Sequence, residues 1–296
     1  MRILVAPPRI IKRELGSTDA TLSWVMTWTG YIIHSKVEIS KGIRFMSIKT
    51  IKASIGRRLR PHPSIFGWAR RIGNIFGFTS PIDYDYIFDL ARRRGRDVFF
   101  LQVGANDGLL DDPIHYLVRM YGWRGILMEP VAFLFNRLKA NYSGVHGPIF
   151  VNAALSEIDG SATFYRVRMA DHLPAWCGML GSFSRDVILS NRNAVPDIES
   201  HIVEESIESI SFRSLIDRYQ PPRIDLVVID TEGYDLQILR QIDLVRFKPE
   251  LIVYEHKHLT ESDRRIAADL LTAHGYRVVN TSWANTVAIS RQPSPV

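Results

Sequence analysis

The chain has 296 residues, of which 46% are hydrophobic and 23% charged, a composition that excludes a fibrous or low-complexity protein. It contains one cysteine, Cys177, which excludes an internal disulfide and a cysteine-based zinc site and favours a reducing, cytoplasmic setting. The net charge of +6 is unevenly spread: residues 1–96 hold 18 Lys and Arg against 6 Asp and Glu, whereas residues 97–296 hold 19 against 25. We therefore expect a basic N-terminal extension, residues 1–96, followed by a mildly acidic domain, residues 97–296.

The extension contains a strongly basic segment, residues 41–81, with nine basic residues and no acidic one. Its apolar residues recur at helical spacing, at Phe45, Ile48, Ile51, Ile55 and Leu59 and again at Ile65, Trp68, Ala69, Ile72 and Phe76. One interpretation is peripheral contact with an anionic membrane at its inner face. The alternative is an amphipathic flank that packs on the domain with its arginines in water. Residues 1–40 show no recognisable element, so the extension is expected to be partly helical or disordered.

No stretch near the N-terminus predicts a membrane-spanning helix. The longest uncharged one, residues 20–35, is 16 residues long and contains Thr, Ser, Gly and His. A spanning helix needs about 20 predominantly apolar residues.

From residue 98 onward, apolar strands alternate with helical patterns, which is typical of βαβ units. Strands are predicted at 98–103, 125–128, 149–154, 226–229 and 251–254, and helices at 114–121, 131–138, 211–219, 236–242 and 261–274. Two closing strands, 276–280 and 286–289, predict a hairpin. The fold expected is a doubly wound, mostly parallel seven-stranded α/β sheet with a C-terminal antiparallel hairpin. A short extra strand at 162–167 precedes an irregular insertion near 168–205, and an insertion of that length is usually functional.

Ligands in such sheets bind at the carboxyl ends of the strands. The first strand ends in VGANDG, whose Gly104 and Gly108 permit a close backbone approach to a ligand. Glu129 ends the second strand, 25 residues after Gly104, where a carboxylate can accept both hydroxyls of a ribose. Asn152 follows the third strand and can hydrogen-bond an adenine edge.

The fourth and fifth strands end in acidic residues and histidines. Asp230, Glu232 and Asp235 surround a turn at Gly233, and Glu255, His256 and His258 follow the neighbouring strand. Because alternate residues of an extended strand point to the same side, Asp230 with Glu232, or His256 with His258, can converge on one site.

Together these motifs resemble the FkbM family of S-adenosylmethionine (SAM)-dependent methyltransferases: VGANDG, ILMEP, VNAALSEIDGSATFY, IDTEGYDLQILR and KPELIVYEH occur in order over about residues 98–289. The resemblance implies a class I, Rossmann-like methyltransferase fold and methyl transfer to an oxygen of a sugar, glycan or secondary metabolite. It also implies that Gly104, Asn106 and Gly108 surround the amino-acid end of SAM, that Glu129 binds the ribose, and that Asn152 and Ala153 contact the adenine.

Transfer to an alcohol requires a base near the methyl group. Asp230 and His256 are the candidates, with Glu232 beside them, although His256 could instead only cap its strand. No metal is the primary expectation; Mg²⁺ or Mn²⁺ held by Asp230, Glu232 and His256 is the alternative. In the insertion, Trp176, Phe183 and Arg185 suit a sugar or anionic acceptor.

Two other functions remain open at this stage. A nicotinamide-dependent oxidoreductase would share the sheet, but its G-x-G-x-x-G fingerprint is absent from the sequence. A non-catalytic methyltransferase-fold adaptor would act through the basic extension. No RNA-binding motif occurs there, so no nucleic acid is expected as a partner.

Overall fold

The computed structural model describes residues 9–12, 21–28, 31–38, 83–110 and 112–291. The chain divides into two units, Met1–His62 and Pro63–Val296. In the first, β1 (Arg9–Lys12), β2 (Thr21–Trp28) and β3 (Tyr31–Glu38) form an antiparallel sheet in that order. The expectation that residues 1–40 hold no element was therefore wrong, because strand pairing creates structure that no single segment signals. The two helical patterns of residues 41–81 lie outside the described residues.

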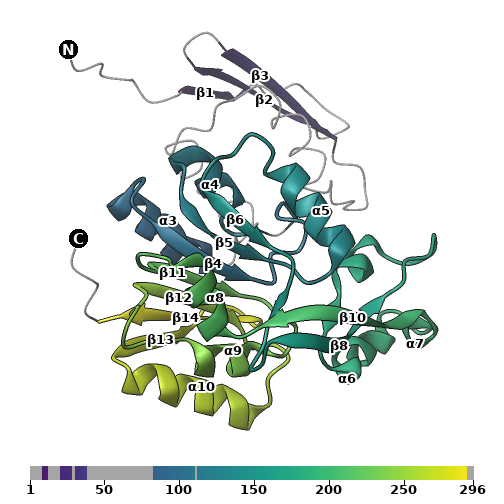
Figure 1. Cartoon of the computed structure of the whole chain (residues 1–296). Coiled ribbons are helices and arrows are strands. Elements are labelled where there is room, and N and C mark those ends of the chain that lie inside the picture. The colour runs from purple at the N-terminus through teal and green to yellow at the C-terminus, as the bar shows by residue number, and fades with distance from the viewer. Residues whose placement is uncertain (1–8, 13–20, 29–30, 39–82, 111, 292–296) are drawn as a thin grey trace. The chain divides into compact units, whose positions relative to one another are not determined.

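The second unit is built on a seven-stranded sheet of order β13-β14-β12-β11-β4-β5-β6 (Figure 1). Its parallel strands are β4 (Phe99–Val103), β5 (Arg124–Met128), β6 (Pro148–Val151), β11 (Leu226–Ile229) and β12 (Leu251–Glu255). The chain closes with β13 (Tyr276–Asn280) and β14 (Asn285–Ser290), and β14 runs antiparallel to both of its neighbours. The predicted seven-stranded sheet and its terminal hairpin are confirmed.

Helices cover both faces of this sheet, as the sorting of alternate strand residues shows. Leu101 and Val103 of β4 pack with α8 (Phe212–Tyr219), α9 (Asp235–Gln241) and α10 (Glu261–Ala273). Phe100 of the same strand packs on the other face with α3 (Asp83–Arg94), α4 (His115–Tyr121) and α5 (Ala132–Asn141). Strand order reverses between β4 and β11, so the carboxyl ends of these two strands flank the switch point at which doubly wound sheets bind ligands.

Helix α3 corrects the boundary expected at residue 97. Its apolar residues Ile87, Leu90 and Ala91 are buried in the core of the sheet domain. Arg93 and Arg94 at its end pair with the buried carboxylate of Glu250, from which Arg94 Nε is 2.9 Å distant. These arginines fasten the helix to the domain, so the domain extends back to α3.

The irregular insertion is a folded subdomain. It lies between the long antiparallel strands β8 (Gly160–Val167) and β10 (Ile202–Ile210), which join β7 (Ala154–Leu155) and β9 (Gly181–Ser182) in a second sheet of order β7-β10-β8-β9. Short helices complete it: η1 (Ala175–Met179), α6 (Arg185–Leu189), η2 (Ser190–Asn193) and α7 (Ile198–His201). A core of its own includes Leu173, Cys177, Ile188 and Ile198. In Figure 1, β8 and β10 run outward from the main sheet to α6 and α7.

Candidate active site

The turn after β4 packs directly against the end of β11. Gly104 has φ +78°, and a Cβ there would lie 1.8 Å from the carbonyl oxygen of Asp230. Gly108 has φ +65°, and a Cβ there would lie 2.2 Å from Leu138 Cδ1. Glycine is required at both positions because a side chain would clash there, and because residues with a side chain rarely adopt the left-handed backbone conformation. The turn is thereby held at the switch point of the sheet.

Asn106 holds this turn on its outer side. Its φ is +51°, its Oδ1 accepts a hydrogen bond from the N–H of Asp107 at 2.8 Å, and its Nδ2 donates to the carbonyl of Met179 at 3.3 Å. Beyond the turn, Asp112 Oδ1 accepts from the N–H groups of Ile114 and His115 at 2.7 and 2.9 Å. Asp112 thus satisfies two backbone N–H groups at the start of α4, and Asn106 links the turn to the insertion.

Glu129 lies buried at the end of β5. One carboxylate oxygen accepts from Asn106 N and the other from Val131 N, both at 2.9 Å. Burial raises the pKa of Glu129 to about 7, and these two hydrogen bonds limit the rise. Each oxygen keeps a lone pair for another donor, so this carboxyl group can accept two hydroxyls of a ligand.

Asn152 stabilises the turn after β5. Its Nδ2 donates to the carbonyl oxygens of Glu129 and Pro130 at 2.8 and 2.9 Å, while Ala153 is buried in the core. The amide nitrogen therefore fixes the backbone at Glu129 and Pro130. No motif in the sequence signals this positioning role.

The ends of β11 and β12 form an acidic wall of Asp230, Glu232, Asp235 and Glu255, in which Asp235 and Glu255 are buried, Glu232 is half-buried and Asp230 is exposed. Desolvation by the surrounding protein, and then the nearby carboxylates of Glu232 and Asp235, raise the pKa of Asp230 well above its ordinary value. Burial, followed by Asp230 and Glu232, raises the pKa of Glu255 to about 10. Lys257 offsets part of this effect at both groups. These raised pKa values mean that the wall does not carry a full negative charge on every carboxyl group near neutral pH.

The two histidines after β12 point to different partners. His256 Nδ1 is 2.8 Å from Thr286 Oγ1 on β14, and burial lowers the pKa of His256. His258 Nε2 is 2.8 Å from Glu232 Oε2 and 3.9 Å from Glu255 Oε2. The structure thus brings His258 to the acidic wall, whereas the sequence placed His256 there.

The insertion docks on the same wall. Ser182 Oγ donates to the carbonyl of Glu232 at 2.7 Å, and the rings of Phe183 and Tyr234 are 4.6 Å apart. A shallow cavity of about 460 Å³, open to solvent, lies between the insertion and the loop after β12 and is lined by Asp186, Val187, Ser190, Lys257 and His258. This cavity adjoins the acidic wall through His258.

The three predicted acceptor residues have separate places. Phe183 packs between Phe164 and Tyr234. Arg185 pairs with Glu199 at 2.9 Å on the outside of the insertion, and Trp176 is partly exposed on η1. None of the three lines the described cavity, whose polar residues Asp186, Ser190 and Lys257 carried no distinctive sequence signal.

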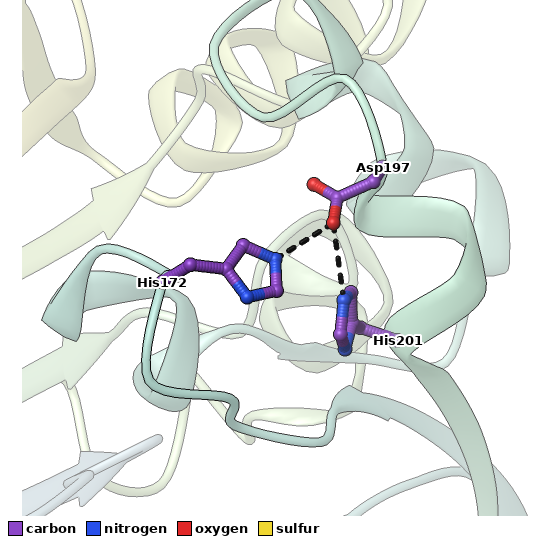
Figure 2. A group of neighbouring side chains, drawn as sticks. All are labelled: His172, Asp197 and His201. Atoms are coloured by element: carbon purple, nitrogen blue, oxygen red, sulfur yellow. Dashed lines mark hydrogen bonds and ion pairs between the residues drawn. The ribbon is translucent and has the colours of Figure 1, made fainter.

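A second group of histidines and a carboxylate lies on the insertion (Figure 2). His172 Nε2 and His201 Nε2 are 2.7 and 3.2 Å from the same oxygen of Asp197. Hydrogen bonding to His172 lowers the pKa of Asp197, so the carboxylate is stabilised in its ionised form. The group ties the start of the insertion to α7.

Comparison with known proteins accounts for this arrangement. The sequence model of the "Methyltransferase FkbM domain" matches residues 102–278, which is more than half of the chain. The chain belongs to the FkbM methyltransferase family. It is a SAM-dependent methyltransferase, and its sheet is that of the class I fold. No curated protein matches it.

Solved structures similar to this FkbM methyltransferase are distant. An O-methyltransferase from Bacillus cereus in complex with SAH is 11% identical at a TM-score of 0.37, covering 82% of this chain and 100% of that one. The fibrillarin pre-rRNA processing protein of Methanococcus jannaschii is 11% identical at 0.36, covering 95% and 98%. A ribosomal protein L11 methylase from Lactobacillus delbrueckii subsp. bulgaricus is 10% identical at 0.33, covering 66% and 70%.

The residues of this FkbM methyltransferase fit SAM. The glycine turn at Gly104 allows a ligand to approach the backbone, and Glu129 presents a buried carboxylate with spare acceptor capacity at the expected strand end. Among the residues that the structure describes, no helix is long and apolar enough to span a bilayer.

Proposed function

We propose that this FkbM methyltransferase methylates a hydroxyl oxygen of a sugar, glycan or other hydroxylated metabolite. The observation that carries the proposal is the cavity of about 460 Å³ beside the acidic wall, lined by Asp186, Ser190, Lys257 and His258. Carboxylate, hydroxyl and ammonium groups are the partners that sugar hydroxyls need for hydrogen bonding.

SAM supplies an activated methyl group and a good leaving group, so the protein has to orient the acceptor and take its proton. Asp230 is the base that we propose. Its backbone contacts Gly104 on the cofactor side, and its side chain is exposed, where an acceptor can reach it. Desolvation by the surrounding protein and the charges of Glu232 and Asp235 raise its pKa, which makes its carboxylate a stronger base than an isolated one. Glu232 and His258 then position the acceptor side of the site. His256, which faces Thr286, is a positioning residue for β14 in this scheme.

For the cofactor, we propose that Gly104, Asn106 and Gly108 surround the amino-acid end of SAM, that Glu129 accepts the ribose hydroxyls, and that Asn152 and Ala153 lie at the adenine. For the acceptor, Trp176, Phe183 and Arg185 remain candidates at the edge of the insertion, and the cavity residues Asp186 and Lys257 join them.

The test is a transfer screen with SAM labelled in its methyl group. Sugar nucleotides, oligosaccharides and small hydroxylated metabolites form one panel; amines, a protein mixture and RNA form the other. We expect label in the first panel, in a product with an alkali-stable methyl ether. Incorporation confined to the amine, protein or RNA panel would overturn the hydroxyl assignment.

We propose further that residues 41–81, which lie outside the described residues, contact anionic membranes. Nine basic residues with no acidic one, alongside apolar residues at helical spacing, support this proposal. The full chain should pellet with anionic liposomes more than with neutral ones, and less as salt rises. A chain that begins at Asp83 is the comparison, and equal pelleting of the two chains would refute the contact.

A further inference from the structure

Three potential metal ligands converge at the ends of β11 and β12. Glu232 Oε2 is 2.8 Å from His258 Nε2, Glu255 Oε2 is 3.9 Å from it, and all three atoms lie within 4.8 Å of one another. Each of these atoms is closed off from solvent, and within the described part of the chain each lacks a hydrogen-bond partner. Buried polar atoms in folded proteins are nearly always paired, so three unpaired ones facing each other require an explanation.

A hydrogen bond does not provide that explanation. The contact between Glu232 and His258 is short enough, yet neither atom has a partner in hydrogen-bond geometry. A hydrogen bond needs the donor N–H to point at the acceptor. Atoms that bind one cation need no such N–H between them, because each directs a lone pair at the cation.

The distances agree with a shared cation. Neighbouring ligands that are about 2.0 to 2.2 Å from a metal stand about 2.8 to 3.1 Å from each other in octahedral geometry and about 3.3 to 3.6 Å in tetrahedral geometry. Of the two distances from His258 Nε2, 2.8 Å lies at the lower end of this range and 3.9 Å lies just above it. Shifts of less than 1 Å would therefore complete the geometry.

The neighbouring negative charges also favour a bound cation. Asp230 and Asp235 lie beside Glu232 and Glu255, and each of these four carboxylates acts on at least one of the others through its charge. A cation between Glu232 and Glu255 would offset the repulsion among these neighbouring carboxylates. Glu232 is also held at φ +50°, a strained backbone for a residue with a side chain, which is found where the surrounding structure fixes a functional group.

We propose that Glu232, Glu255 and His258 bind a divalent transition-row cation on the acceptor side of the active site. Two carboxylate oxygens and one imidazole nitrogen suit Mn²⁺, Fe²⁺ or Zn²⁺ better than Mg²⁺, which favours oxygen ligands alone. His258 also lines the cavity, so a bound cation would adjoin the space assigned to the acceptor. There it would lower the pKa of a hydroxyl group, and this role rests on the proposed function, whereas binding itself does not.

The exposed group of Figure 2 provides the matched control. His172, Asp197 and His201 form the other set of three ligand atoms that lie close enough for a metal among the described residues. Their contacts at 2.7 and 3.2 Å are hydrogen bonds, so the group is satisfied without an ion. Surface histidines nevertheless collect metals in solution, and His172→Gln removes that contribution without touching the active site.

The test uses the full chain, stripped with a chelator and titrated calorimetrically with Mn²⁺ alone and then with Zn²⁺. We expect one Mn²⁺ per chain, a loss of affinity of at least about tenfold in both Glu232→Gln and Glu255→Gln, and unchanged affinity in His172→Gln. Glu255→Gln removes a buried carboxylate, so without metal it should unfold at a temperature no lower than that of the stripped wild type. Retained SAM binding in the variants gives a second check on folding.

The outcomes separate the two ideas. Failure to bind Mn²⁺ and Zn²⁺ at about 1 mM, undiminished binding in Glu255→Gln, or loss of binding in His172→Gln would each overturn the metal site. Metal bound at the proposed residues by a protein that labels only amines would remove the hydroxyl assignment and keep the site. Hydroxyl transfer at full rate by a protein that binds neither cation would remove the metal site and keep the hydroxyl assignment.

Discussion

The two halves of the active-site rim differ in how their polar groups are held. On the cofactor side, Glu129 receives two backbone hydrogen bonds, and Asn152 clamps the backbone of Glu129 in turn. On the acceptor side, Glu232, Glu255 and His258 face one another, and each has a buried atom that makes no hydrogen bond with any described residue. The polar groups of the cofactor side are thus hydrogen-bonded within the chain. Those of the acceptor side leave buried atoms to which the proposed cation would bind.

The halves also differ in the range of the contacts that build them. Glu129 and Asn106 are 23 residues apart and lie on neighbouring strand ends. The acceptor side combines β11, β12 and an insertion whose Ser182 is 50 residues from its partner Glu232. A cofactor common to a whole family suits the local half, and a variable acceptor suits the half that an insertion shapes. The predictions below test this division.

The largest effect should come from replacing the insertion. Val167 of β8 pairs with Ile202 of β10, and Arg168 N donates to His201 O at 2.8 Å, so residues 169–200 can be exchanged for a two-residue Asn-Gly turn. Transfer should fall below detection because the wall of the acceptor cavity is removed. SAM affinity, measured by calorimetry, should stay within about fivefold, since the hydrogen bond from Asn106 to Met179 is worth about 1 kcal/mol.

The control for this exchange is far-ultraviolet circular dichroism together with the melting transition. Parallel loss of SAM binding and transfer in a folded protein would show that the insertion supports both halves of the rim. The division between a local cofactor side and an assembled acceptor side would then fail.

A second effect separates Asp230 from His256. Asp230→Asn should lower the maximal rate by about 100- to 10,000-fold, the usual range for a lost general base, with little change in SAM affinity. His256→Asn preserves a polar contact with Thr286 and should cost far less, because His256 points to β14. Steady-state rates at saturating SAM decide between them. A larger loss in the His256 variant would return that residue to the role the sequence first suggested.

This difference between the histidines shows where prediction from sequence ends. Alternation along an extended strand grouped His256 with His258, but β12 ends at Glu255, and the turn that follows is closed by the hydrogen bond from Leu259 N to His256 O. The extended strand therefore ends one residue before His256, so the rule that alternate residues share a side does not apply to His256 and His258. His256 pairs with β14, and His258 returns to Glu232, a contact that only the tertiary structure sets.

Elsewhere too, the sequence predicts the elements that local patterns determine and misses those that depend on long-range contacts. The sheet and most of its helices were predictable because apolar periodicity and caps such as Asp112 act within a few residues. Helix α3 was missed because its arginines were attributed to a basic extension, although Glu250, far along the chain, pairs with two of them. The insertion was taken for a loop because its core collects single apolar residues from several short helices.

A smaller effect is expected on the cofactor side. Glu129→Gln keeps the shape of the side chain but replaces one charged acceptor oxygen by an amide, so SAM should bind about tenfold more weakly. Titration calorimetry measures the change. Asp107→Asn in the same turn is the control, since among the described residues the Asp107 side chain accepts hydrogen bonds from Leu109 N and Leu110 N alone. Equal affinity of wild type and Glu129→Gln would exclude Glu129 as the ribose ligand.

The smallest effect is a proton linked to cofactor binding. Burial raises the pKa of Glu129 to about 7 in the free protein, so near neutral pH part of the population carries a proton on this carboxyl group. Ribose hydroxyls donate to the ionised form and lower the pKa, so SAM binding should release up to roughly half a proton at pH 7 and should tighten from pH 6 to pH 8. For folding the sign is opposite: the native state retains a proton that the unfolded chain loses near pH 4.3, so stability from this group falls as pH rises from about 4.3 to about 7.

Binding heats in two buffers of different ionisation enthalpy give the number of protons that SAM binding releases. Release should vanish in Glu129→Gln, and undiminished release there would assign the proton to Asp230 on the acceptor side, showing that the two halves of the rim are electrostatically continuous.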